Sequence, residues 1–178
     1  MKKCIIIIDP QKDFTQNNGF YALRHTNISL ILEAKKNIND LLNKIKDDVL
    51  VLIVYSDYAE NQFGENTSMC IPNTEGHEID IIKKDKYLYF QKKDHSAFSE
   101  IDFKNFMKEN SVKKIFIAGF LAEYCVKKTA IDALNNNIQI VLLKDCIGTG
   151  DDVKYRLYEV FDEIIELGGS ILNYKDII

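Results

Sequence analysis

The chain has 178 residues, of which 46% are hydrophobic and 28% charged, and its formal net charge at pH 7 is −4. These values favour a single folded domain over residues 1–178 and argue against disorder, nucleic-acid binding and binding to an anionic membrane. No apolar run approaches the roughly 20 residues that span a membrane. The first apolar run, Cys4–Ile8, is too short for a signal-peptide core and ends at Asp9. We therefore expect a cytoplasmic protein.

In chain order, short apolar runs alternate with segments that have helical periodicity. The runs are mostly continuous, which is typical of parallel strands covered on both faces. The predicted strands are Cys4–Ile8, Val49–Tyr55, Tyr87–Gln91, Lys114–Ala118, Gln139–Leu143 and, more weakly, Ser170–Leu172. The predicted helices run from Asn27 or Ser29 to about Lys46, over Ile101–Lys108 after a Ser99 cap, over Glu123–Asn136, and from Gly150–Asp152 to Gly168–Gly169. The order predicts an α/β fold: a three-layer, doubly wound, Rossmann-like and mostly parallel sheet of five to six strands, with helices on both faces.

One polar segment, Ser56–Asp85, interrupts this regular alternation. A loop of this length inside a compact domain usually has a function. Ligands of open α/β sheets bind at the carboxyl ends of the strands. Asp9 follows the first strand, Lys92 the third and Cys125 the fourth, so an acid, a base and a thiol are expected to meet at one edge.

Cys125 is the candidate nucleophile of this edge. A helix N-terminus and a nearby ammonium such as that of Lys92 both favour the reactive thiolate. Backbone N–H groups in the turn after Gly119 could stabilise an oxyanion. The alternatives are a small buried Cys125, a turn-forming Asp9 and a solvated Lys92. The three histidines lack metal-ligand spacing, and we expect them at the surface or in packing roles.

The chain also carries a series of sequence motifs. The segments IIIIDPQKDF (Ile5–Phe14), CIPNTEGHEI (Cys70–Ile79), KKDHSAF (Lys92–Phe98) and AGFLAEYCVKKTAIDAL (Ala118–Leu134) occur in this order, followed by LLKDCIGT (Leu142–Thr149). In this arrangement the chain resembles the isochorismatase-like cysteine hydrolases, a family that includes nicotinamidases. The resemblance spans nearly the whole chain, and the Ala118–Leu134 motif is its most specific part.

The resemblance implies a catalytic triad of Asp9, Lys92 and Cys125. Asp9 would take the thiol proton and pass it to the leaving amine, while Lys92 would hold Asp9 and favour the thiolate. The implied oxyanion donors are the backbone N–H groups of Leu121 and Cys125, after a cis peptide bond between Phe120 and Leu121. The substrate-binding candidates are Phe14, Gln11, Asp57, Phe120 and Tyr124, with Gln11 also supporting the aspartate loop.

The resemblance also bears on metals and partners. Nicotinamidases bind a divalent metal through Asp-x-His and further histidines, but Ala59 and Met69 stand where two of these histidines would be, and only Asp57 matches. We therefore predict no metal and no cofactor. The expected substrate is a small amide, urea or carbamoyl compound, and the family pattern implies a homo-oligomer, either a dimer or a tetramer.

Three other interpretations stay open at this point. Cys125 could act as a redox thiol or sensor, with Cys146 as a neighbouring thiol at the same sheet edge. The chain could also be a nicotinamidase with a degenerate metal site. A third possibility is a non-catalytic binding module, although the complete set of Asp9, Lys92 and Cys125 argues against it.

Overall fold

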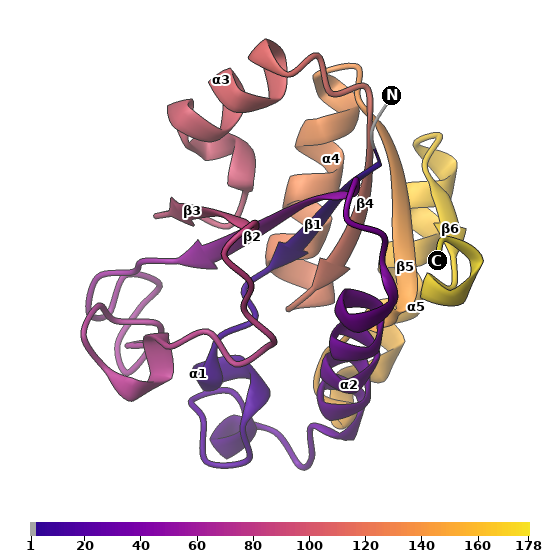
Figure 1. Cartoon of the computed structure of the whole chain (residues 1–178). Helices are drawn as coiled ribbons and strands as arrows, with labels where there is room; N and C mark the ends of the chain where they lie inside the picture. Colours follow the sequence, from indigo (N-terminus) through magenta and orange to yellow (C-terminus); the bar gives the residue numbers. More distant parts are fainter. Residues whose placement is uncertain (1–2) are drawn as a thin grey trace.

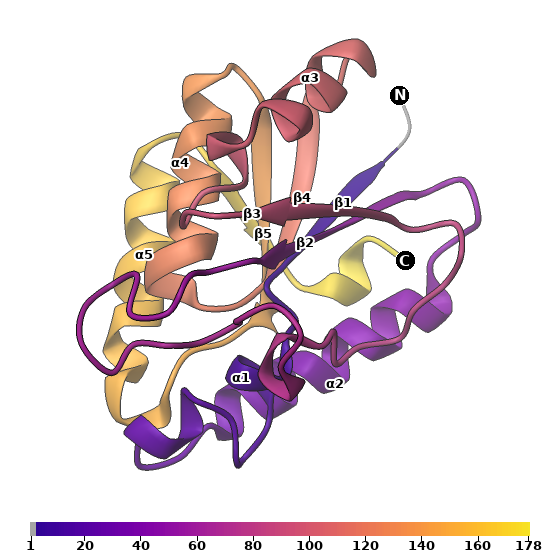
Figure 2. The ribbon, with the colours of Figure 1, turned by 90° about the vertical axis from the view of Figure 1, so that its left-hand side faces the viewer.

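The computed structural model describes residues 3–178, which form one parallel sheet with helices on both faces (Figures 1 and 2). The strand order in the sheet is β3-β2-β1-β4-β5-β6. The six strands are β1 (Cys4–Ile8), β2 (Leu50–Ser56), β3 (Leu88–Lys92), β4 (Lys114–Gly119), β5 (Gln139–Ile147) and β6 (Ser170–Leu172). The predicted fold class is therefore confirmed, including the weak sixth strand.

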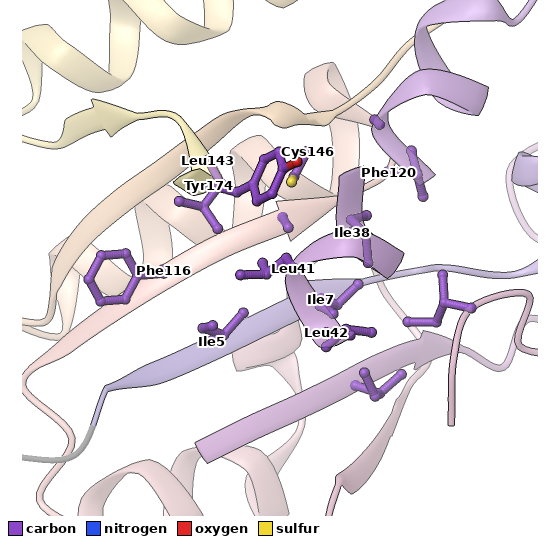
Figure 3. Packing of buried hydrophobic residues seen from close by; sticks show 14 of the residues in the cluster. Ile5, Ile7, Ile38, Leu41, Leu42, Phe116, Phe120, Leu143, Cys146 and Tyr174 are labelled. Atoms are coloured by element: carbon purple, nitrogen blue, oxygen red, sulfur yellow. The ribbon is translucent and has the colours of Figure 1, made fainter. Parts of the chain in front are cut away.

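Alternate residues of the buried strands face the two sides of the sheet, because side chains along a strand point to opposite faces. Ile5 and Ile7 of β1 pack with helix α2 (Ser29–Lys44), and Figure 3 shows Ile38, Leu41 and Leu42 of that helix over them. Ile6 and Ile8 pack on the opposite face, under helices α3 (Ile101–Glu109), α4 (Lys127–Asn135) and α5 (Lys154–Glu166).

The order of the sheet reverses beside β1, since the chain first adds β2 and β3 on one side and then β4 to β6 on the other. Such a switch point leaves a crevice beyond the carboxyl ends of the central strands. The short helix α1 (Lys12–Thr15) follows β1 at this end, and the long segment between β2 and β3 also lies here (Figure 2). The predicted loop Ser56–Asp85 is largely confirmed; it contains one short 3₁₀ turn at Glu75–His77.

Several boundaries differ from the sequence prediction. Lys92 is the last residue of β3 rather than the first after it, and β5 continues through Cys146. The helix predicted over Glu123–Asn136 is divided into a π-helical turn, Ala122–Val126, and α4. In the π-helical turn the Val126 N–H donates to the Leu121 carbonyl five residues earlier. One extra residue is thereby fitted into the turn that carries Cys125.

The helix caps also differ from the predicted ones. Ser96 caps the 3₁₀ turn before α3, and the predicted Ser99 makes no cap. Neither Asn27 nor Ser29 caps α2 with its own side chain. Instead the Asp151 carboxylate accepts hydrogen bonds from the Leu30 N–H at 3.1 Å and the Ser29 hydroxyl at 2.6 Å. None of the helices in residues 3–178 has the length and apolar character needed to cross a bilayer.

Candidate active site

Asp9, Lys92 and Cys125 lie together at the carboxyl end of the sheet. Asp9 directly follows β1, Lys92 ends β3, and Cys125 lies in the turn after β4. The Lys92 Nζ lies 2.9 Å from Asp9 Oδ2 and 3.4 Å from Cys125 Sγ. Asp9 and Lys92 are completely buried, and Cys125 has 4% of its surface exposed. Buried charges of this kind are stable only when they are paired, and here the partner of each is the other.

Lys92 is held by more than its two neighbours in the triad. Its ammonium also donates to the Ser56 hydroxyl at 2.7 Å, the Tyr58 hydroxyl at 3.0 Å and the Asp94 carbonyl at 3.1 Å. Burial lowers the pKa of Lys92, but the negative charge of Asp9 and the contacts with Asp9 and Cys125 more than offset this, and the pKa is raised above its usual value. Lys92 therefore stays a cation and a fixed positive charge beside the sulfur.

The two carboxylate oxygens of Asp9 differ in their surroundings. Oδ1 accepts a hydrogen bond from the Ser56 hydroxyl at 2.9 Å. Oδ2 is close to the Lys92 ammonium but is not aligned for a hydrogen bond with it, and no other group among residues 3–178 donates to it. Oδ2 is therefore the oxygen that is free to accept a proton. Asp9 is also within hydrogen-bonding reach of the Cys125 side chain.

The protonation of Cys125 differs from the prediction. We expected the helix N-terminus and Lys92 to favour the thiolate, but burial raises the pKa of the Cys125 thiol to about 12. The negative charge of Asp9 adds to this rise, and Lys92 opposes it only in part. The resting group is thus a thiol. Its activation requires transfer of the proton to a base, and Asp9 is the adjacent one.

Two backbone features place the nucleophile. The peptide bond between Phe120 and Leu121 is cis, as the family resemblance implied. The Leu121 N–H has no acceptor among the described residues, and no hydrogen bond from the Cys125 N–H leaves the π-helical turn. The Leu121 N–H thus remains available at the predicted oxyanion position.

A cavity of about 350 Å³ opens over Cys125. Its wall is mostly aromatic and is formed by Phe14, Phe20, Tyr21, Tyr58, Phe63 and Tyr124. The Tyr58 hydroxyl also forms a hydrogen bond of 3.5 Å with Cys125 Sγ, in which either group can donate, and so links the cavity wall to the triad. Leu121 and Cys125 form the reactive end of the wall.

The predicted substrate-binding residues separate into two groups. Phe14 and Tyr124 line the cavity, whereas Gln11, Asp57 and Phe120 do not. The Gln11 amide instead exchanges two hydrogen bonds with the Ser56 backbone, at 2.7 and 2.9 Å, and so fixes the aspartate loop to β2. Phe120 is fully buried in the core on the α2 side of the sheet. Asp57 turns toward His77, 3.1 Å away.

Sequence reasoning missed the roles of Ser56 and of several cavity residues. The cavity residues that it missed, Arg24, His25, Thr67, Met69 and His95, all come from loops. Ser56 follows a predicted strand at the same edge as Asp9, and this position was the available signal. The loop residues carried no such signal, because their contacts depend on how three separate loops close over the sheet.

The residues near Asp57 do not fit the metal that nicotinamidases hold. Ala59 and Met69 supply no nitrogen or oxygen ligand from their side chains, and the Asp57 carboxylate already faces His77. Within residues 3–178, no group of three or more His, Cys, Asp or Glu side chains is arranged to hold a metal ion.

The thiol pair considered for a redox role is also separated. Cys125 packs in the cluster under α3, α4 and α5, whereas Cys146 packs with Tyr174 on the α2 face (Figure 3). All four cysteines are free and buried, and burial raises the pKa of Cys125 further from the low values of redox-sensing thiols. The redox interpretation is therefore not favoured.

Comparison with known proteins bears on the site as a whole. A family model described as the isochorismatase domain matches residues 3–158. An uncharacterised isochorismatase family protein of Bacillus subtilis, PncA, is 27% identical over 162 residues, which cover 84% of this chain and 87% of that protein. The fold matches the zinc complex of a Pyrococcus horikoshii pyrazinamidase with a TM-score of 0.83, at 22% identity and coverage of 97% and 99%. It also matches N-carbamoylsarcosine amidase from Thermoplasma acidophilum, with a TM-score of 0.80 at 16% identity and coverage of 98% and 97%.

Proposed function

Because this chain belongs to the isochorismatase family of hydrolases, we propose that it is a cysteine hydrolase that cleaves the C–N bond of a small amide, urea or carbamoyl compound through a covalent intermediate on Cys125. The observation that carries the proposal is the position of the Lys92 ammonium, 2.9 Å from Asp9 and 3.4 Å from the sulfur of Cys125, which itself lines an aromatic cavity. The pyrazinamidase and N-carbamoylsarcosine amidase named above share the fold and act on C–N bonds of this kind.

In the first half of the reaction, Asp9 Oδ2 takes the proton of the Cys125 thiol while the sulfur attacks the substrate carbonyl carbon. The carbonyl oxygen becomes an oxyanion, which the backbone N–H groups of Leu121 and Cys125 stabilise. The C–N bond then breaks, and the proton on Asp9 passes to the departing nitrogen. The products of this half are an amine or ammonia and a thioester on Cys125.

In the second half, water enters the position that the amine has left. Asp9 takes a proton from the water while the water oxygen attacks the thioester carbon. The resulting oxyanion then collapses and the C–S bond breaks. The proton returns to the sulfur and restores the thiol. Lys92 keeps its positive charge throughout, which favours the leaving thiolate of Cys125 without adding a proton to the balance.

The test is a panel of small primary amides, ureas and carbamoyl compounds, with detection of released ammonia. We expect turnover by the wild-type protein, loss of turnover in Cys125→Ala, and a mass increase on Cys125 when the reaction is stopped early. Cys146→Ala is the matched control, since this thiol is equally buried but lies on the other face of the sheet. Turnover that survives Cys125→Ala would contradict the covalent mechanism.

We further propose that the reaction needs no metal, on the grounds that Ala59 and Met69 offer no ligand and Asp57 faces His77. Dialysis against a strong chelator is expected to leave kcat/KM unchanged, and added Zn²⁺ or Mn²⁺ is expected not to raise it. A loss of activity on chelation that a metal restores would overturn this part of the proposal. The dimer or tetramer and the cytoplasmic location stay predictions.

A further inference from the structure

The cavity over Cys125 has an uneven distribution of charge. Its aromatic wall is interrupted by three basic side chains, those of Arg24, His25 and His95. No Asp or Glu belongs to the lining formed by the described residues. A cavity lining with basic groups and no acidic ones favours a ligand with a negative charge, because opposite charges attract.

Arg24 is fixed in place but is not neutralised. Its guanidinium lies over the Phe20 ring, 3.5 Å from the ring centroid, and donates to the carbonyls of Phe20 and Asn66 at 3.0 and 2.8 Å. These acceptors are uncharged, and Arg24 forms no ion pair with any carboxylate in residues 3–178. A guanidinium carries five N–H donors, so two bonds leave donors free to reach a ligand.

The two histidines of the cavity, His25 and His95, share the same kind of partner. A carboxylate lies beside Nδ1 of each ring: Asp152 beside His25 at 2.9 Å and Asp94 beside His95 at 3.3 Å. Because a carboxylate only accepts, each Nδ1 carries the proton. The rings pack on aromatic neighbours, with His25 4.1 Å from the Tyr21 centroid. These contacts hold both rings in the cavity wall, and the N–H donors for a negatively charged ligand come from Arg24.

A third acid near the cavity, Glu123, pairs with Arg156 rather than with Arg24. One of its oxygens accepts from the Thr149 hydroxyl at 2.9 Å and lies 3.5 Å from the Arg156 guanidinium. Its charge therefore does little to cancel that of Arg24. The cavity thus has a reactive end at Cys125, an aromatic middle and an uncompensated cation at Arg24.

We propose that the substrate of this hydrolase carries a carboxylate as well as the scissile C–N bond, and that Arg24 binds this carboxylate and determines specificity. The proposal rests on the proposed hydrolase function and names its substrate class: an amide or carbamoyl derivative of a small carboxylic acid. Arg binds carboxylates through two parallel N–H···O bonds, which also fixes orientation. The scissile carbonyl would thereby be directed to the sulfur.

The probes are ω-carboxamide acids with two to five methylene groups between the ends, each compared with its own methyl ester. The ester keeps the length and removes the charge. For the best chain length, we expect kcat/KM for the acid to exceed that for the ester by about 10- to 100-fold, the usual discrimination from a charged hydrogen bond. Arg24→Gln is expected to abolish this preference, and Arg24→Lys to keep part of it.

Lys113→Gln is the control for net charge, since Lys113 is exposed and precedes β4 at the opposite end of the sheet. It should leave the acid-to-ester ratio unchanged. A purely structural role for Arg24, as a link between Phe20 and Asn66, would instead lower acid and ester turnover equally in Arg24→Gln and would overturn the proposal. The proposal would also be overturned if the wild-type protein hydrolysed the carboxamide of the methyl ester as fast as that of the acid.

A binding measurement separates this proposal from the hydrolase function. In Cys125→Ala, calorimetry with the same acids and esters should show preferential acid binding that Arg24→Gln removes. If no probe is hydrolysed but this preference is observed, carboxylate recognition stands and the amidase function fails. If the carboxamide group of the esters is hydrolysed and the acids are not preferred, the amidase function stands and carboxylate recognition fails. Neither hydrolysis nor preferential binding would reject both.

Discussion

The Lys92 ammonium lies 2.9 Å from the Asp9 carboxylate, and neither side chain has any exposed surface. Each charge is therefore stable only because of the other, since an isolated ion in the interior costs several kcal/mol. The pair joins β1 to β3 across β2, whose Ser56 hydroxyl bonds both partners. Catalysis and stability consequently depend on the same contact.

The first prediction separates these two roles. Asp9→Asn removes the base and leaves the Lys92 charge unpaired, so we expect turnover to be abolished and the free energy of unfolding to fall by about 3–5 kcal/mol. Adding Lys92→Met should restore most of the stability but none of the activity. Urea denaturation measures the first quantity and ammonia release the second.

A surface pair provides the control for that experiment. Asp47 is fully exposed and lies 2.6 Å from the Lys86 ammonium, and exposed pairs contribute little to stability. Asp47→Asn should therefore change neither stability nor turnover. If the double variant at positions 9 and 92 were no more stable than Asp9→Asn alone, the buried ion pair would not be the source of the loss.

The second prediction follows from the raised pKa of Cys125. With a thiol pKa of about 12 in the free protein, the thiolate is scarce at neutral pH. Each unit of pH below 12 lowers its fraction about tenfold. The rate of alkylation by iodoacetamide should therefore keep rising from pH 7 to pH 11, while that of a free cysteine thiol with a pKa of about 8.5 levels off by about pH 10. Cys125→Ala gives the background from the other thiols. A plateau below pH 8 would indicate a resting thiolate.

The third prediction concerns the Tyr58 hydroxyl, which lies 3.0 Å from Lys92 Nζ and 3.5 Å from Cys125 Sγ. Tyr58→Phe leaves the ring in the cavity wall but removes this link. We expect kcat to fall about tenfold, the usual cost of one charged hydrogen bond, with a smaller change in KM. Tyr87→Phe is the matched variant, because its hydroxyl is buried against the Leu42 carbonyl, far from the triad. Equal losses in both variants would mean that Tyr58 acts only through packing.

The fourth prediction compares two glycines with the same backbone conformation. Gly119 has φ 121° and Gly64 has φ 125°, so alanine is strained at both positions. A Cβ at Gly64 meets no atom within 4 Å, whereas at Gly119 it collides with the Ile8 backbone, next to Asp9. Gly119→Ala should lose more unfolding free energy than Gly64→Ala by about 2 kcal/mol or more. It should also lower turnover. Similar melting curves for the two variants would contradict this account of Gly119.

The sequence was most informative where the signal is local or follows from sheet geometry. Continuous apolar runs predicted the strands, and the rule that ligands meet at the carboxyl edge brought Asp9, Lys92 and Cys125 to one place. Contacts between distant segments could not be predicted in the same way. The cap of α2 comes from Asp151, about 120 residues away, while the adjacent Asn27 and Ser29 looked sufficient.

The protonation of Cys125 shows a second limit. A helix start and a nearby lysine are visible in a sequence, and both lower a thiol pKa. Burial is a property of the packed molecule, and it raises the pKa by more than these effects lower it. Prediction of the cavity lining is limited in the same way, because Arg24, Thr67 and His95 come from three loops that meet only after folding.

The buried thiol of Cys125 also determines how the protein meets reactive small molecules. Peroxides and simple electrophiles react with thiolates, and the resting protein offers very little thiolate at neutral pH. It should therefore tolerate oxidants that inactivate enzymes with an exposed, acidic cysteine. A covalent inhibitor would gain little from a more electrophilic group. Its selectivity would come from filling the aromatic cavity and placing a carbonyl or nitrile carbon beside the sulfur, where Asp9 can remove the proton.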